Sequence, residues 1–274
     1  MKVLGIDFTS APVGNKHITC LRCTLEDGVL SASARDLLEL RIKGFEDILK
    51  EKGPWIVGID FPFGQSRTFI QNIGWPATWA GYVEHARRLG KVGFYDALTA
   101  YRNTRPDGSK EHQRATDKVA RSLSPQKLHG IPVGKMFFEG APRLIDAGVT
   151  IPGLQAGDPD RVVVEAYPAV LARKFIGKAS YKTDDKRKQT EGQLAIRRAL
   201  LRQIVDAPLT EYGVRVVADH SLADDPSGDH LDALLCAIQA AWSWTQRKRG
   251  YGKADDFDRL EGWIADPTCA APRH

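Results

Sequence analysis

The chain has 274 residues, of which 42% are apolar, and its 39 lysines and arginines exceed its 34 aspartates and glutamates, which leaves a formal charge of +5. This length and composition allow one large hydrophobic core, so we expect a single domain over residues 1–274. No run approaches roughly 18 apolar residues, the four cysteines form no secretory framework, and no signal segment opens the chain. We therefore expect a cytoplasmic protein that spans no membrane; the sequence predicts no oligomeric state.

Two short apolar runs of nearly identical sequence each lead to an aspartate. Residues 3–8 read Val-Leu-Gly-Ile-Asp-Phe and contain Asp7, and residues 56–61 read Ile-Val-Gly-Ile-Asp-Phe and contain Asp60. Both runs are typical of fully buried strands that stop at a turn. Because an unpaired carboxylate is costly to bury, Asp7 and Asp60 predict a metal site at one edge of a sheet. The alternative is that each aspartate forms a turn by bonding nearby backbone amides.

Between these two runs, the pattern predicts a hairpin and a helix. Residues 17–25 and 29–36 alternate like antiparallel strands around a Glu-Asp-Gly turn, and residues 45–50 form a short amphipathic helix. Cys20 and Cys23 have the spacing of a zinc-binding pair, but no second pair follows. Alternation along a strand would also direct their sulfurs to opposite faces, so the pattern disfavours a zinc site.

Residues 64–157 predict a helical insertion between the fourth and fifth strands. The segment is rich in aromatic residues, is interrupted by glycine and proline, and is too long for a plain loop. We expect it to select the substrate, because its arginines can neutralise phosphates and its aromatic rings can stack on unpaired bases. The residues expected to make these contacts are Arg102, Arg105 and Arg114, and Trp75, Trp79 or Tyr101.

A third acid ends another β-branched run. Residues 161–165 read Arg-Val-Val-Val-Glu, and Pro168 is placed to open a helix. Glu165 thus ends an apolar run in the same way as Asp7 and Asp60 do. The elements expected after it are helices near 168–176 and 186–205 and a short strand at 214–217.

The closing helix starts on two further acids. It runs from Asp229 to about residue 244, and Asp229 and Asp232 lie three residues apart on one face of its first turn. The helix dipole favours negative charge there. Alternatively, Asp229 is a helix cap that follows Ser227 and Gly228. With the three strand-end acids, five carboxylates are available to one cleft.

Basic residues gather in two polar stretches. They suit a polyanionic partner such as nucleic acid, whereas the alternative is that both stretches are solvated helix faces. The two groups are Arg102, Arg105, Lys110, Arg114, Lys118 and Arg121, and Lys182, Lys186, Arg187, Lys188, Arg197, Arg198 and Arg202.

Five motifs, taken together, point to a known family. They are Gly5-Ile6-Asp7-Phe8-Thr9-Ser10, Gly58-Ile59-Asp60-Phe61-Pro62-Phe63-Gly64, Glu165-Ala166-Tyr167-Pro168, Tyr181-Lys182 and Asp229-His230-Leu231-Asp232-Ala233-Leu234. Their order and spacing resemble those of the ribonuclease H-like superfamily. Their residue sequences are similar to the motifs of the predicted nuclease family known as domain of unknown function 429. The resemblance implies a five-stranded mixed sheet in the order 3-2-1-4-5, with strands 1, 4 and 5 parallel and helices on both faces. By analogy it also implies metal-dependent cleavage of phosphodiester bonds.

The implied sheet order brings the strand-end acids together. Strands 1, 4 and 5 would be neighbours about 4.8 Å apart, so Asp7, Asp60 and Glu165 would form a row where open α/β sheets bind ligands. Asp229 or Asp232 would complete the set. Hard oxygen ligands without histidine or thiolate select Mg²⁺ or Mn²⁺, and two ions about 4 Å apart would serve phosphodiester hydrolysis.

Each acid has an expected role in this two-ion site. Asp7, on the central strand, would bridge the ions; Asp60 would hold one ion, and Asp229 or Asp232 the other. Glu165 would either ligate an ion or orient a water molecule.

Two further residues have both a functional and a structural reading. Lys182 would bind the scissile phosphate or neutralise the site, or it is a solvated surface residue. His230 lies between the two helix acids and would shuttle protons, or it is a surface residue of the first helical turn.

Three functions are compatible with the sequence. The first is a metal-dependent nuclease. The second is a nucleotide-dependent phosphotransferase of the actin-like kinase superfamily, whose first phosphate loop also reads Gly-Ile-Asp followed by small hydroxyl residues, although no second loop of that type occurs here. The third is a nucleic-acid-binding protein that kept the fold and lost catalysis.

Overall fold

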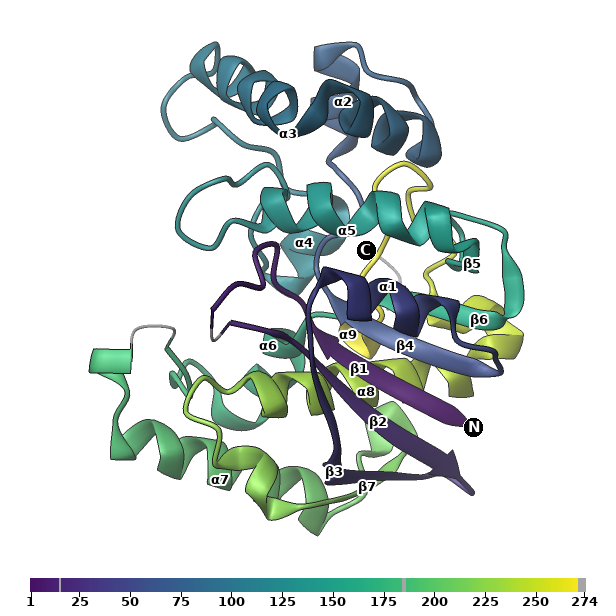
Figure 1. Ribbon diagram of the computed structural model, residues 1–274, viewed down its shortest axis with the longest axis vertical. Helices are drawn as coiled ribbons and strands as arrows, with labels where there is room; N and C mark the ends of the chain where they lie inside the picture. Colours follow the sequence, from purple (N-terminus) through teal and green to yellow (C-terminus); the bar gives the residue numbers. More distant parts are fainter. Residues whose placement is uncertain (15, 184–185, 271–274) are drawn as a thin grey trace.

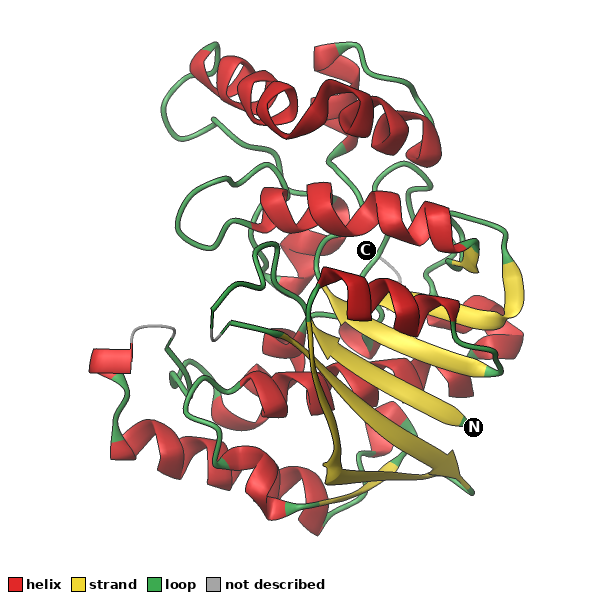
Figure 2. Ribbon diagram, in the orientation of Figure 1, coloured by secondary structure: helices red, strands yellow, loops and turns green. Residues whose placement is uncertain are grey.

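Figure 1 shows the computed structural model, which describes residues 1–14, 16–183 and 186–270. The chain has an α/β fold in which helices cover both faces of a seven-stranded mixed sheet (Figure 2). The strand order is β5-β6-β4-β1-β2-β3-β7, and within this described sheet β2 alone runs antiparallel to its neighbours. The strands are β1 (Lys2–Asp7), β2 (Ile18–Glu26), β3 (Val29–Leu40), β4 (Trp55–Asp60), β5 (Val149–Thr150), β6 (Asp158–Glu165) and β7 (Arg215–Ala218).

The sheet differs from the predicted one at its two edges. The predicted number of five strands is wrong, because the sheet has seven. The short strand expected at 214–217 is β7, which pairs with β3, and β5 lies within the segment expected to be helical. Between these edges, β6, β4 and β1 are parallel neighbours. The ends of the three acid-bearing strands therefore lie side by side.

Helices enclose the sheet from both sides (Figure 1). The helices α6, α7 and α8 contribute to the core on one face, whereas α1, α2, α3 and α5 contribute to the core on the other, with α2 and α3 farthest from the sheet. The helices are α1 (Ile42–Lys50), α2 (Arg67–Ile73), α3 (Trp79–Asn103), α4 (Ala115–Ala120), α5 (Val133–Ala147), α6 (Pro168–Ile176), α7 (Glu191–Asp206), α8 (Asp229–Thr245) and α9 (Pro267–Ala270). The short 3₁₀ segments are η1 (Lys186–Lys188), η2 (Thr210–Tyr212), η3 (His220–Ala223) and η4 (Arg247–Gly252).

Two glycines in the strands allow α8 to lie directly on the sheet. Ile6 of β1 belongs to the core on the α1 and α5 side, so its neighbours Gly5 and Asp7 face α8. A β-carbon on Gly5 would lie 1.8 Å from the carbonyl oxygen of Ala233, and one on Gly58 would lie 2.4 Å from another carbonyl oxygen of α8. No side chain fits in that space, and this explains the glycine in both Gly-Ile-Asp-Phe motifs.

The aromatic residues of the segment 64–157 build a core rather than a binding surface. Trp75 and Trp79 are only 9% and 3% exposed, and the ring of Trp75 packs 5.4 Å from that of Phe69. Tyr101 is partly buried, and its ring packs 5.0 Å from the same phenylalanine. The expectation that Trp75 or Trp79 stacks on nucleic-acid bases is therefore wrong, because both rings are enclosed by other side chains.

The cysteines and the helices bear on two further expectations. Cys20 and Cys23 are buried in the cores on opposite faces of the sheet, which confirms that their sulfurs do not converge. Both are free thiols. None of the helices in the described part of the chain combines the length and the apolarity that a bilayer span requires.

Candidate metal centre

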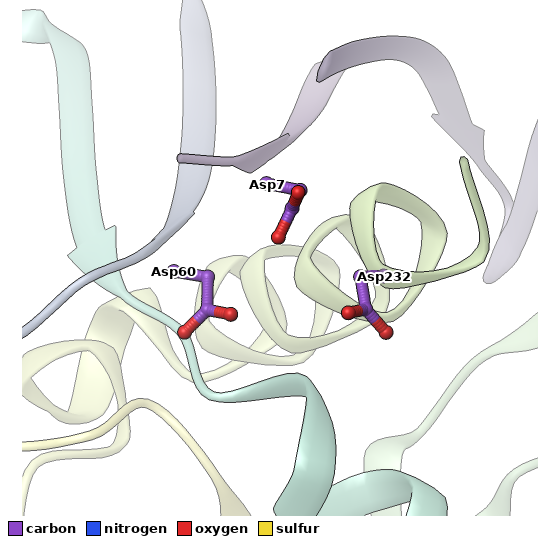
Figure 3. Close-up of side chains that lie close together, drawn as sticks. All are labelled: Asp7, Asp60 and Asp232. Atoms are coloured by element: carbon purple, nitrogen blue, oxygen red, sulfur yellow. The ribbon is translucent and has the colours of Figure 1, made fainter. Parts of the chain in front are cut away.

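Asp7 and Asp60 meet because the strands that carry them run in register. The two residues are paired across β1 and β4, each at the carboxyl end of its strand. Each also lies two residues after a glycine that faces α8, so both side chains point toward that helix. Asp232, in the first turn of α8, completes the group, and one carboxylate oxygen from each of the three lies within 4.8 Å of the others. Figure 3 shows the three side chains projecting into one space.

Asp232 is held in place by two residues of the segment between α6 and α7. The hydroxyl of Tyr181 donates a hydrogen bond of 2.5 Å to its Oδ1, and the ammonium of Lys182 donates to its Oδ2. Asp232 is only 1% exposed, whereas the side chain of Lys182 is 32% exposed. Lys182 is therefore the ion-pair partner of the cluster and not a freely solvated lysine.

The cluster is short of positive charge. Burial raises the pKa of Asp7 well above its usual value; Lys182 opposes this shift, and the neighbouring aspartates add to it. Burial, reinforced by Asp232, raises the pKa of Asp60 to about 7. Burial alone would lower the pKa of Lys182, but Asp232 and Asp7 outweigh it and raise that pKa well above the ordinary value. A divalent cation would supply the missing charge.

The free energy of unfolding of the metal-free protein is expected to decrease as the pH rises from about 4 to about 7. The pKa of Asp60 is about 7 in the folded chain and about 3.9 in an unfolded one, so the folded state holds more protons between these values and loses stability as the pH rises. Asp60→Asn removes this titration and should stabilise the protein by on the order of 2–4 kcal/mol near pH 8. Thermal melts of both proteins in EDTA measure the difference. If the melting temperatures of the two proteins change with pH in the same way, the expectation is wrong.

Glu165 ends β6 at the same edge of the sheet but faces the other way. Its partner in the ladder is Ile59 and not Asp60, so Glu165 shares the face of Val163, which lies in the core on the α1 and α5 side. The group of three carboxylates does not include it. The expected row of strand-end acids is thus divided between the two faces of the sheet.

Glu165 is bonded instead to Arg114, which is 1% exposed. One amino group of Arg114 donates to Oε1 of Glu165 at 2.5 Å and to Oδ1 of Asp117 at 2.8 Å, and the other donates to Oε2 of Glu165 at 2.8 Å. The backbone N–H of Phe63 donates to the same carboxylate at 2.9 Å. The expectation that Arg114 contacts a phosphate is wrong, because its guanidinium is enclosed and paired with two carboxylates.

Asp229 lies at the first position of α8, but it does not cap the helix. The backbone N–H groups of Asp229 and His230 donate to the carboxylate of Asp225 at 2.8 and 3.3 Å, so Asp225 caps α8. Asp229 lies outside the group of three ligands, although its charge helps to raise the pKa of Asp7. Its own pKa is raised by burial. His230 is partly buried, and its role as a proton shuttle stays a prediction.

A pocket of about 210 Å³ adjoins the acidic cluster. Asp60, Asp232 and Lys182 line it on the cluster side. The other walls come from the ends of β4 and β6, the start of α6, α5 and the segment that precedes it, and most of their side chains are apolar or aromatic. The three ligands thus lie at the border between a charged site and an apolar space.

Three residues that shape the site were not singled out for these roles from the sequence. Asp225 begins an Asp-Pro-Ser-Gly sequence ahead of a helix, which is typical of a capped start. Asp117 lies three residues after Arg114 at the start of α4, the spacing of a capping box. Tyr181 carries no comparable signal for its bond to Asp232, because the two residues are 51 positions apart.

Comparison with protein families gives a match that covers most of the chain. The model of the family described as "Protein of unknown function (DUF429)" matches residues 5–255 and so includes all the candidate site residues. No curated protein and no solved structure matches the chain.

Proposed function

The chain belongs to the DUF429 family, and we propose that it is a metal-dependent nuclease that hydrolyses phosphodiester bonds of nucleic acid. One observation carries the proposal. Three carboxylates from separate elements, Asp7, Asp60 and Asp232, converge within 4.8 Å at the carboxyl ends of parallel strands. The sheet supports a ribonuclease H-like assignment, in which β7 and β5 extend a central set of five strands in the order β3-β2-β1-β4-β6.

The residues of the site fit Mg²⁺ or Mn²⁺. All three candidate ligands are carboxylates, whose oxygens are the hard ligands that both ions prefer, and no histidine or cysteine joins the described group. Burial, reinforced by the neighbouring aspartates, raises the pKa values of Asp7 and Asp60, and a divalent cation would favour their ionised forms. When bound, such ions stabilise charge on phosphate oxygens and lower the pKa of a water molecule. Asp7, Asp60 and Asp232 would together hold two such ions.

The surrounding residues orient the candidate ligands and adjust the charge of the site. Tyr181 fixes one oxygen of Asp232 by donating a hydrogen bond to it, a constraint that typically improves metal affinity. Lys182 stays protonated at neutral pH because its pKa is raised, and its positive charge beside the cluster is proposed to neutralise a phosphate oxygen. Asp229 contributes further negative charge beside Asp7, so it is proposed to strengthen cation binding from outside the described group of three.

Exposed basic residues near the pocket supply a surface for the phosphate backbone. Lys118 and Arg121 are exposed at the end of α4, and the residues that follow them, Ser122 and Leu123, line the pocket. Such contacts attract nucleic acid regardless of its sequence and weaken with salt. Arg114 is buried and does not belong to this surface, whereas the expected contribution of Arg102 and Arg105 stays a prediction.

The proposal is tested with labelled single-stranded DNA, duplex DNA and RNA incubated with Mn²⁺, with Mg²⁺ or with EDTA. We expect cleavage of at least one substrate that requires the divalent ion and is absent in EDTA. Fluorescence anisotropy should show binding that weakens steeply as salt increases. Charge reversal of Lys118 and Arg121 together should weaken binding of every sequence alike, without changing the affinity for Mn²⁺ in the absence of nucleic acid.

Two outcomes would favour the rival functions. Binding of ATP without binding of any oligonucleotide at low salt favours a phosphotransferase. Salt-dependent binding of nucleic acid with no cleavage under either ion favours a binding protein that lacks catalysis. Either result would exclude the nuclease proposal for these substrates.

A further inference from the structure

We propose that the 210 Å³ pocket beside the acidic cluster receives the base of the nucleotide whose phosphate lies at the metal centre. The inference rests on the proposed function, and it specifies the substrate further. A base held in this pocket must leave its stack, so the substrate is a single strand, a frayed end or an unpaired position rather than an intact duplex.

The position of the pocket links it to the site of cleavage. Asp60 and Asp232, two of the three candidate ligands, line it, together with Lys182. A phosphate held by a metal ion at these carboxylates would therefore have its own sugar and base within reach of the pocket. The polar lining residues are those on the cluster side, the ion-paired group of Arg114, Asp117 and Glu165, and Ser122. The lining residues of α5 are apolar, so the pocket matches the division of a nucleotide into an anionic phosphate and a flat, less polar base.

The walls of the pocket suit a flat ring. Val133 and Met136 of α5 line it together with Leu123 and Ile131 of the preceding segment. Leu123 and Ile131 are 37% and 63% exposed, although both are large and apolar. Exposed apolar side chains beside a pocket are typical of a surface that a ligand covers.

Tyr167 supplies an aromatic ring to the lining of the pocket. It lies in the Glu-Ala-Tyr-Pro motif between β6 and α6, it is partly buried, and it lines the pocket. The guanidinium carbon of Arg173 lies 5.4 Å from the centre of its ring. This cation–π contact steadies the ring and leaves Tyr167 placed to stack on a base, the role that Trp75 and Trp79 cannot fulfil.

The polar side chains of the pocket favour tolerance of different bases. Arg114, Ser122 and Lys182 all donate to carboxylates of the protein itself, and so does Tyr181. These groups therefore offer few free donors that could read the edge of a base. Recognition by stacking and apolar contact alone does not distinguish strongly between bases.

The volume limits the occupant to a small group. Pockets for drug-sized ligands typically have about 300–1,000 Å³, so a space of about 210 Å³ suits one base rather than a pair of stacked bases. We therefore infer that the pocket accepts one nucleotide at a time.

The experiment compares the binding of AMP and of ribose 5-phosphate in the presence of Mn²⁺ by calorimetry. Both probes carry the same phosphate, and only AMP carries a base. We expect AMP to bind at least about fivefold more tightly, as stacking on one base provides. Ile131→Asp places a charge at the pocket and should remove this difference, while the affinity for ribose 5-phosphate stays within about twofold.

Val92→Asp is the matched control. Val92 is 73% exposed on α3 and does not line the pocket, so the same change there should leave the preference for AMP intact. Equal binding of AMP and ribose 5-phosphate by the unaltered protein would overturn the inference. So would a preference for AMP that persists in Ile131→Asp.

A second measurement separates this inference from the proposed function. If the protein cleaves a single strand, an abasic position at the cleavage site should reduce cleavage at least about fivefold, and Ile131→Asp should affect the intact strand but not the abasic one. Equal cleavage of both strands by the unaltered protein overturns the inference and leaves the nuclease proposal in place. If no strand is cleaved but AMP is still preferred, the nuclease proposal fails and the pocket stands as a nucleotide-binding site.

Discussion

Asp7→Asn is expected to abolish divalent-dependent cleavage and to raise the melting temperature of the protein in EDTA. Asp7 lies in register with Asp60, and its carboxylate is close to that of Asp232, so the substitution removes one of the three ligands of the proposed two-ion site. In the absence of metal the same change removes a buried carboxyl group whose pKa is raised by burial and, to a smaller extent, by repulsion from the neighbouring aspartates. Added Mn²⁺ should stabilise the unaltered protein, and it should stabilise Asp7→Asn far less.

Asp107→Asn is the control for this prediction. The side chain of Asp107 is 95% exposed and pairs with the surface residue Lys110, so its neutralisation should change the melting temperature little and leave the response to Mn²⁺ intact. Cleavage and thermal melts with and without Mn²⁺ measure both variants. A large loss of stability in Asp7→Asn without metal would mark Asp7 as a structural residue.

Arg114→Met is expected to destabilise the protein by about 3–5 kcal/mol, because it leaves two buried carboxylates without their partner. Arg114 donates to both Asp117 and Glu165, and all three side chains are 1–3% exposed. For a chain of this size the loss corresponds to a fall in melting temperature on the order of 10 °C. The expected effect is on folding, since these residues join α4 to the end of β6.

Arg102→Met tests the same change at the surface. Arg102 is 47% exposed and lies 3.8 Å from Glu111, so the substitution should cost less than about 1 kcal/mol. Adding Asp117→Asn and Glu165→Gln to Arg114→Met should recover part of the lost stability, because the uncompensated charges are then absent. If Arg114→Met melts like the unaltered protein, the network contributes little to stability. If the triple variant is no more stable than Arg114→Met, unpaired charge is not the cause of the loss.

The sequence by itself determined the local elements of the site. Apolar runs that stop at a turn predicted β1 and β4. The Gly-Ile-Asp-Phe sequence that both runs share indicated that Asp7 and Asp60 have equivalent positions at the ends of their strands. The spacing of Asp229 and Asp232 placed both acids at the start of α8. These inferences succeed because strand alternation and helical spacing are local properties that the backbone imposes on neighbouring residues.

The insertion shows where composition misleads. Its tryptophans and Arg114 have the chemistry of a nucleic-acid surface, but the fold buries them. An aromatic or arginine side chain serves a core as well as a surface, and the choice depends on which distant residues surround it. For Arg114 the deciding partner is Glu165, 51 positions away.

The tertiary structure alone decided which acids meet. Glu165 ends a strand at the same edge as Asp60, yet its ladder partner is Ile59, and this offset of one residue turns its side chain to the opposite face of the sheet. Asp232, and not Asp229, joins Asp7 because α8 lies directly on the two strand glycines. Contacts between residues far apart in the chain set the register between strands and the position of a helix on a sheet. A local sequence pattern does not encode these contacts.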